Sequence, residues 1–136
     1  MKKYRVLWTV CMLVLLGTLA GCAIHREAVK LQDLEFSVLA PERVPQELGE
    51  LIAEKIKEPF QMTYNDGEYL YLVEGYGEQP TGGYSVTVEE LSLTENAIYV
   101  HTTLLGPGPG EQKKNTPSYP YIVIKTPLRE EQVIFR

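Results

Sequence analysis

The chain contains few of the residues that most catalytic and metal-binding sites use. Its 136 residues include two cysteines, Cys11 and Cys22, and two histidines, His25 and His101. No cysteine follows Cys22, and Cys11 lies in an apolar run near the N-terminus. The part of the chain after Cys22 therefore cannot form an internal disulfide, supply a catalytic thiolate or bind zinc through cysteine sulfur.

Positive charge is also scarce. The chain has 13 Lys and Arg against 18 Asp and Glu, which gives a formal net charge of −5 at pH 7. Lys2, Lys3 and Arg5 lie at the extreme N-terminus, so the rest of the chain is more acidic than the whole. Because an acidic surface repels phosphate groups, we expect no nucleic-acid partner and no basic patch for anionic lipid.

The N-terminal residues have the layout of a secretory signal peptide. The basic head is followed by the uncharged apolar residues 6–16 and then by the small-residue junction Leu19-Ala20-Gly21-Cys22. This order predicts that residues 1–21 are removed on export. Residues 6–24 carry no charge and reach the roughly 20 residues that span a bilayer, so an uncleaved anchor stays open as an alternative.

The junction resembles the lipobox of bacterial lipoproteins, in which the cysteine is acylated and becomes the first residue of the mature chain. The resemblance implies lipidation of Cys22 and an extracytoplasmic protein anchored to a bacterial membrane. Several acyl chains would hold it firmly, since each buried methylene contributes about 0.8 kcal/mol. We expect the polar residues 22–33 to form a tether and residues 34–136 to form one domain.

Hydrophobic periodicity predicts a mainly β (α+β) domain with one amphipathic helix. The alternating residues 34–39 predict a first strand, and a helix is expected to begin at Pro45 and end at Pro59. The apolar residues of this helix fall on one face: Leu48, Leu51, Ile52 and Ile56.

A period of two then continues to the C-terminus. Residues 61–64 and 69–75 predict a hairpin, because the turn Asn65-Asp66-Gly67 supplies the positive φ that tight turns need. The further strands are expected at residues 84–91, 98–105, 120–125 and 132–135. The predicted architecture is a small antiparallel sheet or sandwich with one packed helix.

Three segments interrupt the β pattern with rigid, glycine-bearing or aromatic-bearing loops, which suit recognition at low entropic cost. Ordinary turns, a strand crossover and aromatic cover at the edge of the core are the alternatives. We predict partner binding by the following residues: Pro80, Thr81, Gly82, Gly83, Tyr84, Gly106, Pro107, Gly108, Pro109, Gly110, Tyr119, Pro120 and Tyr121.

The runs PTGGYSVTVEEL, TTLLGPGPGE and YPYIVIKTP, within residues 80–127, resemble the C-terminal domain of the protease complex subunit PrcB. We expect the match to extend over residues 34–136. The resemblance implies a non-catalytic module, named for the lipoprotein subunit of a cell-surface protease complex. It implies no catalytic residue.

A looser likeness is to chagasin-type inhibitors of cysteine proteases. These use a Pro-Thr-Thr-Gly loop, a glycine-rich loop and a later Arg-Pro-Trp loop on an immunoglobulin-like sandwich. This chain has Pro80-Thr81-Gly82-Gly83, the glycine-proline run and Tyr119-Pro120-Tyr121 in the same order. It lacks the second threonine, the arginine and the tryptophan.

We predict no enzyme, no cofactor and no metal. His101 falls within a predicted strand, no His-Glu-x-x-His spacing occurs, and no serine has a nucleophile-elbow context. The pairs Glu89-Glu90 and Glu130-Glu131 are expected to point to opposite faces of their strands. The predicted function is a lipid-anchored module that binds an exported protein, a protease being one candidate. The alternatives are a protease inhibitor and a structural envelope lipoprotein.

Overall fold

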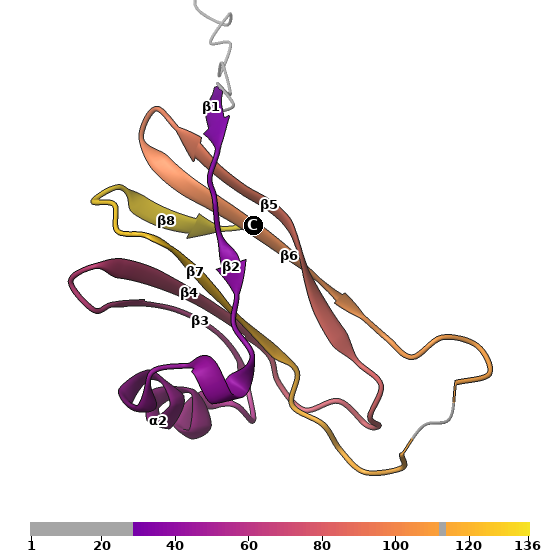
Figure 1. Ribbon diagram of the computed structural model, residues 1–136. Coiled ribbons are helices and arrows are strands. Elements are labelled where there is room, and N and C mark those ends of the chain that lie inside the picture. The colour runs from indigo at the N-terminus through magenta and orange to yellow at the C-terminus, as the bar shows by residue number, and fades with distance from the viewer. Residues whose placement is uncertain (1–28, 112–113) are drawn as a thin grey trace, which may run out of the picture.

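The computed structural model describes residues 29–111 and 114–136, which form two four-stranded sheets and one α-helix (Figure 1). The predicted signal peptide, Cys22 and the first part of the tether lie outside the described residues. No helix in the described part of the chain is long and apolar enough to cross a membrane.

The two sheets have different strand orders. The first sheet, in spatial order, consists of β1 (Lys30–Asp33), β5 (Ser85–Thr94), β6 (Ala97–Leu105) and β8 (Gln132–Phe135). The second sheet consists of β2 (Ser37–Val38), β7 (Tyr121–Pro127), β4 (Tyr69–Tyr76) and β3 (Pro59–Asn65). All pairings are antiparallel except that between β6 and β8, which is parallel.

The main core lies between the sheets and follows from the alternation within each strand. Successive side chains of a strand point to opposite faces, so every second apolar residue of β4, β5, β6 and β7 reaches this space. Its buried members are Leu70, Leu72, Leu91, Leu93, Ile98, Val100, Ile122 and Ile124. A β-bulge between Val88 and Glu90 interrupts the alternation of β5.

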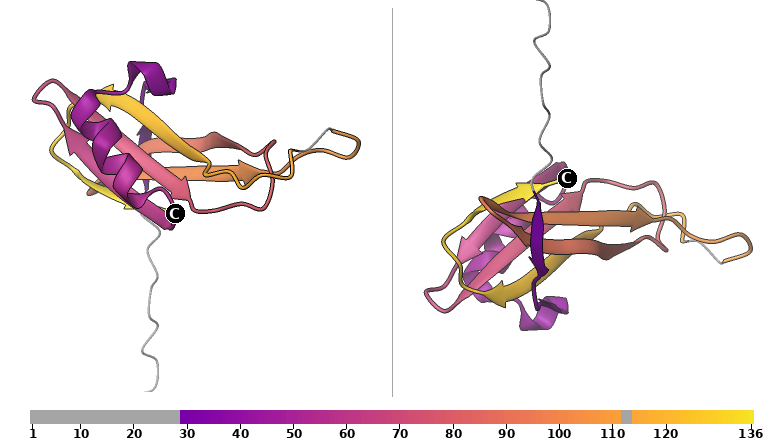
Figure 2. Two further views of the ribbon diagram at one scale, coloured as in Figure 1. Left: turned by 90° about the horizontal axis from the view of Figure 1, so that it is seen from below. Right: turned by 90° about the horizontal axis from the view of Figure 1, so that it is seen from above.

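A second apolar cluster lies on the outer face of the second sheet, where α2 (Gln46–Lys55) packs (Figure 2). Leu48 and Ile52 of the helix are buried against Tyr71, Val73 and Val123 of the sheet. The acidic first turn and the basic last turn of α2 complement the helix dipole. The predicted helix is thereby confirmed, with its end at Lys55 and a turn before β3.

The β3–β4 hairpin is held by the side chain of Asp66. Its carboxylate accepts hydrogen bonds from the backbone N–H groups of Glu68 and Tyr69, at 2.9 and 2.7 Å, and these lower the pKa of Asp66. Its other oxygen accepts a bond from the Tyr71 hydroxyl over 2.9 Å. Burial, assisted by this carboxylate, raises the pKa of Tyr71 to about 12. Gly67 supplies the positive φ, of 91°, as predicted.

Three predictions about the strands were wrong. Residues 30–33, predicted as tether, form β1 and pair with residues 92–94 of β5. Within the predicted strand 34–39, only Ser37–Val38 forms a strand, which pairs with β7, while the residues before it cross between the sheets. The last strand, β8, was expected to be antiparallel but runs parallel to β6. The other predicted strands are confirmed within a few residues.

Candidate functional site

The connections β4–β5 and β6–β7 lie at the same end of the sandwich and extend beyond both sheets (Figure 2). Together they carry the three motifs that the sequence singles out. The first motif lies in the β4–β5 connection. The glycine-proline run and Tyr119-Pro120 belong to the single β6–β7 connection. We call these two connections the loop end.

A short backbone ladder joins the two connections. Gln79 and Ser118 exchange both backbone hydrogen bonds, at 2.8 and 3.0 Å. The N–H of Gly82 donates to the carbonyl of Lys114 over 3.1 Å, and the Ser118 hydroxyl donates to the carbonyl of Thr81 over 2.7 Å. The described residues of the loop end therefore hold one another in place, although they are far apart in the sequence.

The glycines allow the first two motifs to approach each other closely. Gly83 has a φ of 87°, and a Cβ added there would lie 3.0 Å from Cβ of Pro107. A Cβ added at Gly106 would lie 3.5 Å from the ring of Tyr84. The structure thus brings together residues from the first and second predicted loops, and glycine is required at Gly83 for both space and conformation.

The third motif is only partly in the loop end. The Tyr119 hydroxyl donates to the Glu78 carboxylate over 3.1 Å, and this bond raises the pKa of Tyr119. The carbonyl of Pro120 accepts a bond from the N–H of Tyr76 over 3.0 Å. Tyr121 differs from the prediction: it is the first residue of β7, pairs with Gly75 and packs with the helix cluster. It is a residue of the sandwich and not of a loop.

The solvent-facing surface of the loop end contains glycines and prolines together with the polar side chains of Glu78, Glu111, Lys114, Asn115 and Thr116. The exposed members of the predicted set are Pro80, Gly83, Gly106, Pro109 and Gly110. The other loop members are half-buried against one another. Where glycine and proline are exposed, the surface presents peptide groups with few side chains to order.

A buried polar network, which the sequence did not reveal, lies between the sheets behind the loop end. Glu74 of β4 is 9% exposed, and its carboxylate accepts hydrogen bonds from Gln61 at 2.9 Å and from Thr102 of β6 at 2.6 Å. The Tyr76 hydroxyl lies 2.5 Å from that of Thr102. Since the Thr102 proton points to Glu74, Tyr76 is the donor in this second bond. The sequence feature that could have indicated this network is Glu74, a single Glu within the apolar run of residues 69–76.

The carboxylate pairs are not placed as predicted, because Glu130 and Glu131 precede β8 and lie outside any strand. The bulge in β5 removes the strict alternation on which the prediction for Glu89 and Glu90 rested. Glu90 accepts a bond from the Ser92 hydroxyl over 2.6 Å and lies 3.9 Å from the Arg136 guanidinium. Glu131 pairs with Arg129 over 2.8 Å, which lowers the pKa of Glu131.

Metal-ligating side chains are also dispersed. Within residues 29–111 and 114–136, no group of three His, Cys, Asp or Glu side chains is placed to hold a metal ion. His101 is exposed on β6, opposite Glu90 of the neighbouring strand.

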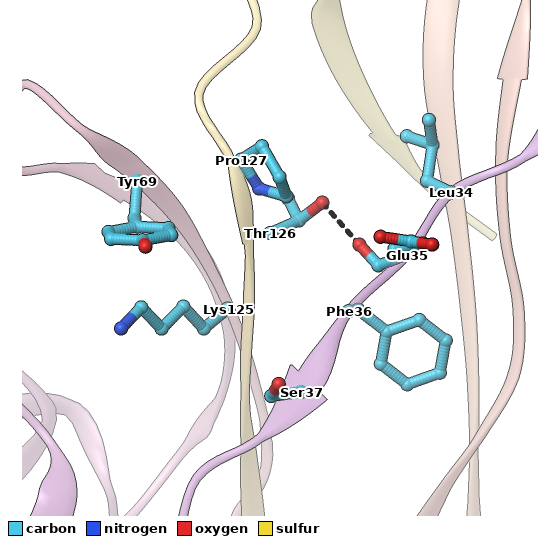
Figure 3. A pocket seen from close by; sticks show the side chains of 8 residues that line it. All are labelled: Leu34, Glu35, Phe36, Ser37, Tyr69, Lys125, Thr126 and Pro127. Carbon is cyan, nitrogen blue, oxygen red and sulfur yellow. Dashed lines mark hydrogen bonds between the residues drawn. The ribbon is translucent and has the colours of Figure 1, made fainter.

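An open crevice lies at the other end of the second sheet (Figure 3). It lies between β7 and the segment joining β1 to β2, where the Thr126 hydroxyl donates to the carbonyl of Glu35 over 2.8 Å. The ammonium of Lys125 lies 3.9 Å from the ring centre of Tyr69, and Phe36 is 42% exposed. The crevice is wide open and shares no lining residue with the loop end.

The described residues form a small β-sandwich with a helix on one sheet and two connections joined by a short backbone ladder. Residues 70–127, from β4 to the end of β7, match the family model described as PrcB C-terminal. This match confirms the resemblance to the PrcB C-terminal domain over these residues. The match is shorter than the expected residues 34–136. No curated protein and no solved structure matches the chain.

Proposed function

We propose that the protein is a membrane-anchored, non-catalytic module that binds another exported protein through its loop end. The single observation that supports this most strongly is the ladder between the two connections, in which Gln79 and Ser118 exchange both backbone bonds. A connection that served only to reverse the chain would not need hydrogen bonds to a second connection. The ladder holds the described residues of the loop end in place before a partner binds, which reduces the entropy lost on binding.

The chemistry of the loop end supports binding over catalysis. The exposed residues of the predicted contact set are prolines and glycines, which supply no acid, base or nucleophile, although Glu78, Glu111 and Lys114 are exposed beside them. The hydroxyl of Tyr119, in the third motif, donates a hydrogen bond to the Glu78 carboxylate. The raised pKa of Tyr119 keeps its hydroxyl protonated, so it acts as a donor and not as a base.

Photocrosslinking from the loop end tests this proposal. A photoreactive residue is placed at position 80 or at position 109 in the full chain, expressed in a bacterial envelope, and the products are identified by mass spectrometry. We expect a discrete crosslinked protein from both positions. The same residue at Pro127, an exposed proline at the opposite end of the second sheet, is the matched control and should not give this product. Equal products from all three positions would contradict the proposal.

A charge variant provides the second arm. Pro80→Glu with Pro109→Glu adds two carboxylates to the loop end, and we expect the crosslinked or co-purified partner to be lost while the folding transition is kept. Pro127→Glu should leave the partner bound. Retention of the partner in the double variant would place binding elsewhere on the molecule.

The proposed anchor depends on Cys22 and needs its own test. We expect Cys22→Ala to lose metabolic labelling by a lipid precursor and to shift the protein to the soluble fraction or to leave it unprocessed. Lipid labelling that persists in Cys22→Ala would rule out the lipidated cysteine. A protein that stays in the membrane without labelling would support the uncleaved apolar anchor instead.

Protease inhibition is a second candidate function, favoured by the contact of Gly83 with Pro107, which places two of the chagasin-like motifs side by side. The likeness is incomplete, because the second and third motifs share one connection and Tyr121 lies in β7. Titration of a papain-type protease with the protein separates the two functions. Stoichiometric loss of protease activity would support inhibition, and full activity at high excess would exclude it for that class.

A further inference from the structure

Strand β3 (Pro59–Asn65) forms an outer edge of the second sheet over seven residues. It pairs with β4 on one side through an unbroken antiparallel register, from Pro59 opposite Tyr76 to Asn65 opposite Leu70. In the part of the chain that the structure describes, no strand pairs with its other side. Figure 1 shows β3 as the last strand of its layer.

The register identifies which backbone groups of β3 point outward. In an antiparallel pair, only every second residue bonds to the neighbouring strand. The N–H of Asp66 donates to the carbonyl of Tyr69 over 3.2 Å, which sets the phase of this alternation. The N–H and C=O groups of Gln61, Thr63 and Asn65 therefore face the free edge. The side chains of these three residues are exposed as well.

The edge lacks the features by which proteins protect such strands. Edge strands are usually short, bulged, charged or interrupted by proline within the strand. The sequence PFQMTYN has no charged residue, and its proline is at the first position, Pro59. The other outer strands are better protected: β1 has four residues with a register shift, β2 has two residues, and β8 has four.

One carboxylate of α2, that of Glu47, contacts β3 on the helix side of the sheet. The Tyr64 hydroxyl donates to the Glu47 carboxylate over 2.8 Å, which fixes one flank of the helix above β3. Glu50 and Glu54 follow at helical spacings of three and seven residues from Glu47, and both are exposed. Lys55 lies in the last turn of α2 next to Glu54, and Lys57 follows the helix, toward the Pro59 end of the strand.

We propose that β3 is a second binding edge, which takes an extended basic segment of a partner protein as an added strand. The backbone groups of Gln61, Thr63 and Asn65 would pair with the segment, and its Lys or Arg side chains on the helix side would meet Glu47, Glu50 and Glu54. Strand addition of this kind obtains affinity from backbone bonds and specificity from alternate side chains. The proposal does not depend on the loop end, which uses other residues.

Charge decides between a foreign segment and a second copy of this chain. Pairing β3 with β3 of another copy would bring together two segments 46–58, each of which carries four Glu against two Lys and is therefore net negative. Like charges across an interface oppose association, whereas a basic segment neutralises this negative charge. The occupant is therefore a partner segment of opposite charge.

A designed peptide is the probe. A fluorescent seven-residue peptide that alternates Val and Lys is titrated into the full chain in detergent micelles, and fluorescence anisotropy is recorded. The matched probe has the same sequence with methyl groups on its backbone nitrogens, so it keeps the charge and loses the donors. We expect binding at least about tenfold weaker for the methylated peptide, equivalent to about 1.4 kcal/mol. Equal affinity of the two peptides would overturn the proposal.

Two variants locate the site. Thr63→Pro removes one outward N–H and no bond to β4, because proline is tolerated at the free side of an edge strand. Glu50→Lys with Glu54→Lys reverses two charges of α2, and Glu89→Lys with Glu95→Lys on β5 and the following turn makes the same change in net charge away from β3. We expect about tenfold weaker binding in the first two variants and little change in the third. An equal loss of peptide affinity in both charge variants would show that the peptide is attracted by the net charge of the protein and not by a site at β3.

Hydrogen exchange gives a readout that needs no substitution. The amides of Gln61, Thr63 and Asn65 should exchange rapidly in the free protein and slowly with the Val-Lys peptide. Protection of the free protein that depends on its concentration would show that a second copy occupies the edge. Protection at all concentrations would show that another segment of the chain does so. Either result, or unchanged exchange with bound peptide, would overturn the proposal, while the crosslinks from the loop end would stand or fall separately.

Discussion

The carboxylate of Glu74 accepts a hydrogen bond from the hydroxyl of Thr102 over 2.6 Å, which joins the two sheets through their interior. Both residues are buried, and neither belongs to the apolar cluster between the sheets. A bond to a charged group contributes more than a neutral one, about 1.5–3 kcal/mol. This hydrogen bond therefore stabilises the packing of the two sheets, whose other contacts in the core are made by apolar side chains.

Thr102→Val should lower the free energy of unfolding by about 2 kcal/mol, because it keeps the shape of the side chain and leaves the Glu74 carboxylate short of a donor. Thr103→Val, at the next residue of β6, is the matched control and should change stability by less than about 0.5 kcal/mol. Urea denaturation of the two variants measures the difference. Equal effects would show that the buried bond contributes nothing specific.

Gly83→Ala should be destabilised by about 1–2 kcal/mol, because its φ of 87° is unfavourable for a residue with a Cβ. The added carbon would also press on Pro107. Gly82→Ala is the control in the same loop: Gly82 has no positive φ, and the nearest atom to an added Cβ is 3.8 Å away. Thermal unfolding should separate the two variants. If both unfold at the same temperature, the loop is not held in the described conformation.

Gly75→Ala should destabilise the protein by about 1–3 kcal/mol, since an added Cβ would overlap the ring of Phe60 on the neighbouring strand. In a Phe60→Ala background the same substitution should cost little, because the ring is gone. A double-mutant cycle from denaturation curves measures this coupling. Additive effects of the two substitutions would contradict the predicted overlap.

The stability of the protein should fall in acid through Asp66. Hydrogen bonds from Tyr69 and Glu68 lower the pKa of Asp66 in the folded state, so its contribution is complete above the ordinary value of about 3.9. The contribution is lost as the pH falls through the lower folded pKa. Asp66→Asn keeps an acceptor and removes the titration, so it should flatten this decline. Glu95→Gln, an exposed carboxylate in the β5–β6 turn, is the control for the loss of one negative charge.

The elements that could be predicted from the sequence are those that neighbouring residues determine. The hairpin follows from Asn65-Asp66-Gly67, whose side chains and positive φ close the turn without help from the rest of the chain. The helix follows from the spacing of Leu48 and Ile52 and from prolines at its borders. In these cases the local preference and the final fold agree.

The missed features depend on partners far away in the chain. The residues of β1 read KLQD and show no apolar alternation, so only pairing with residues 92–94 of β5 makes them a strand. The Glu74–Thr102 bond joins residues 28 positions apart, and the place of Glu74 in an apolar run does not identify Thr102 as its partner. The loop residues could be predicted as rigid, but the ladder of Gln79 with Ser118 could not.

The segment of β1 and β2 pairs in turn with β5 in the first sheet and β7 in the second. These hydrogen bonds lie across the direction of the strands. A pull on the chain at residue 29, directed along this segment, would load the bonds of both sheets in shear before it reached the core. The N-terminal segment therefore serves as a mechanical coupling, through which a force applied at that end is shared by both layers of the sandwich.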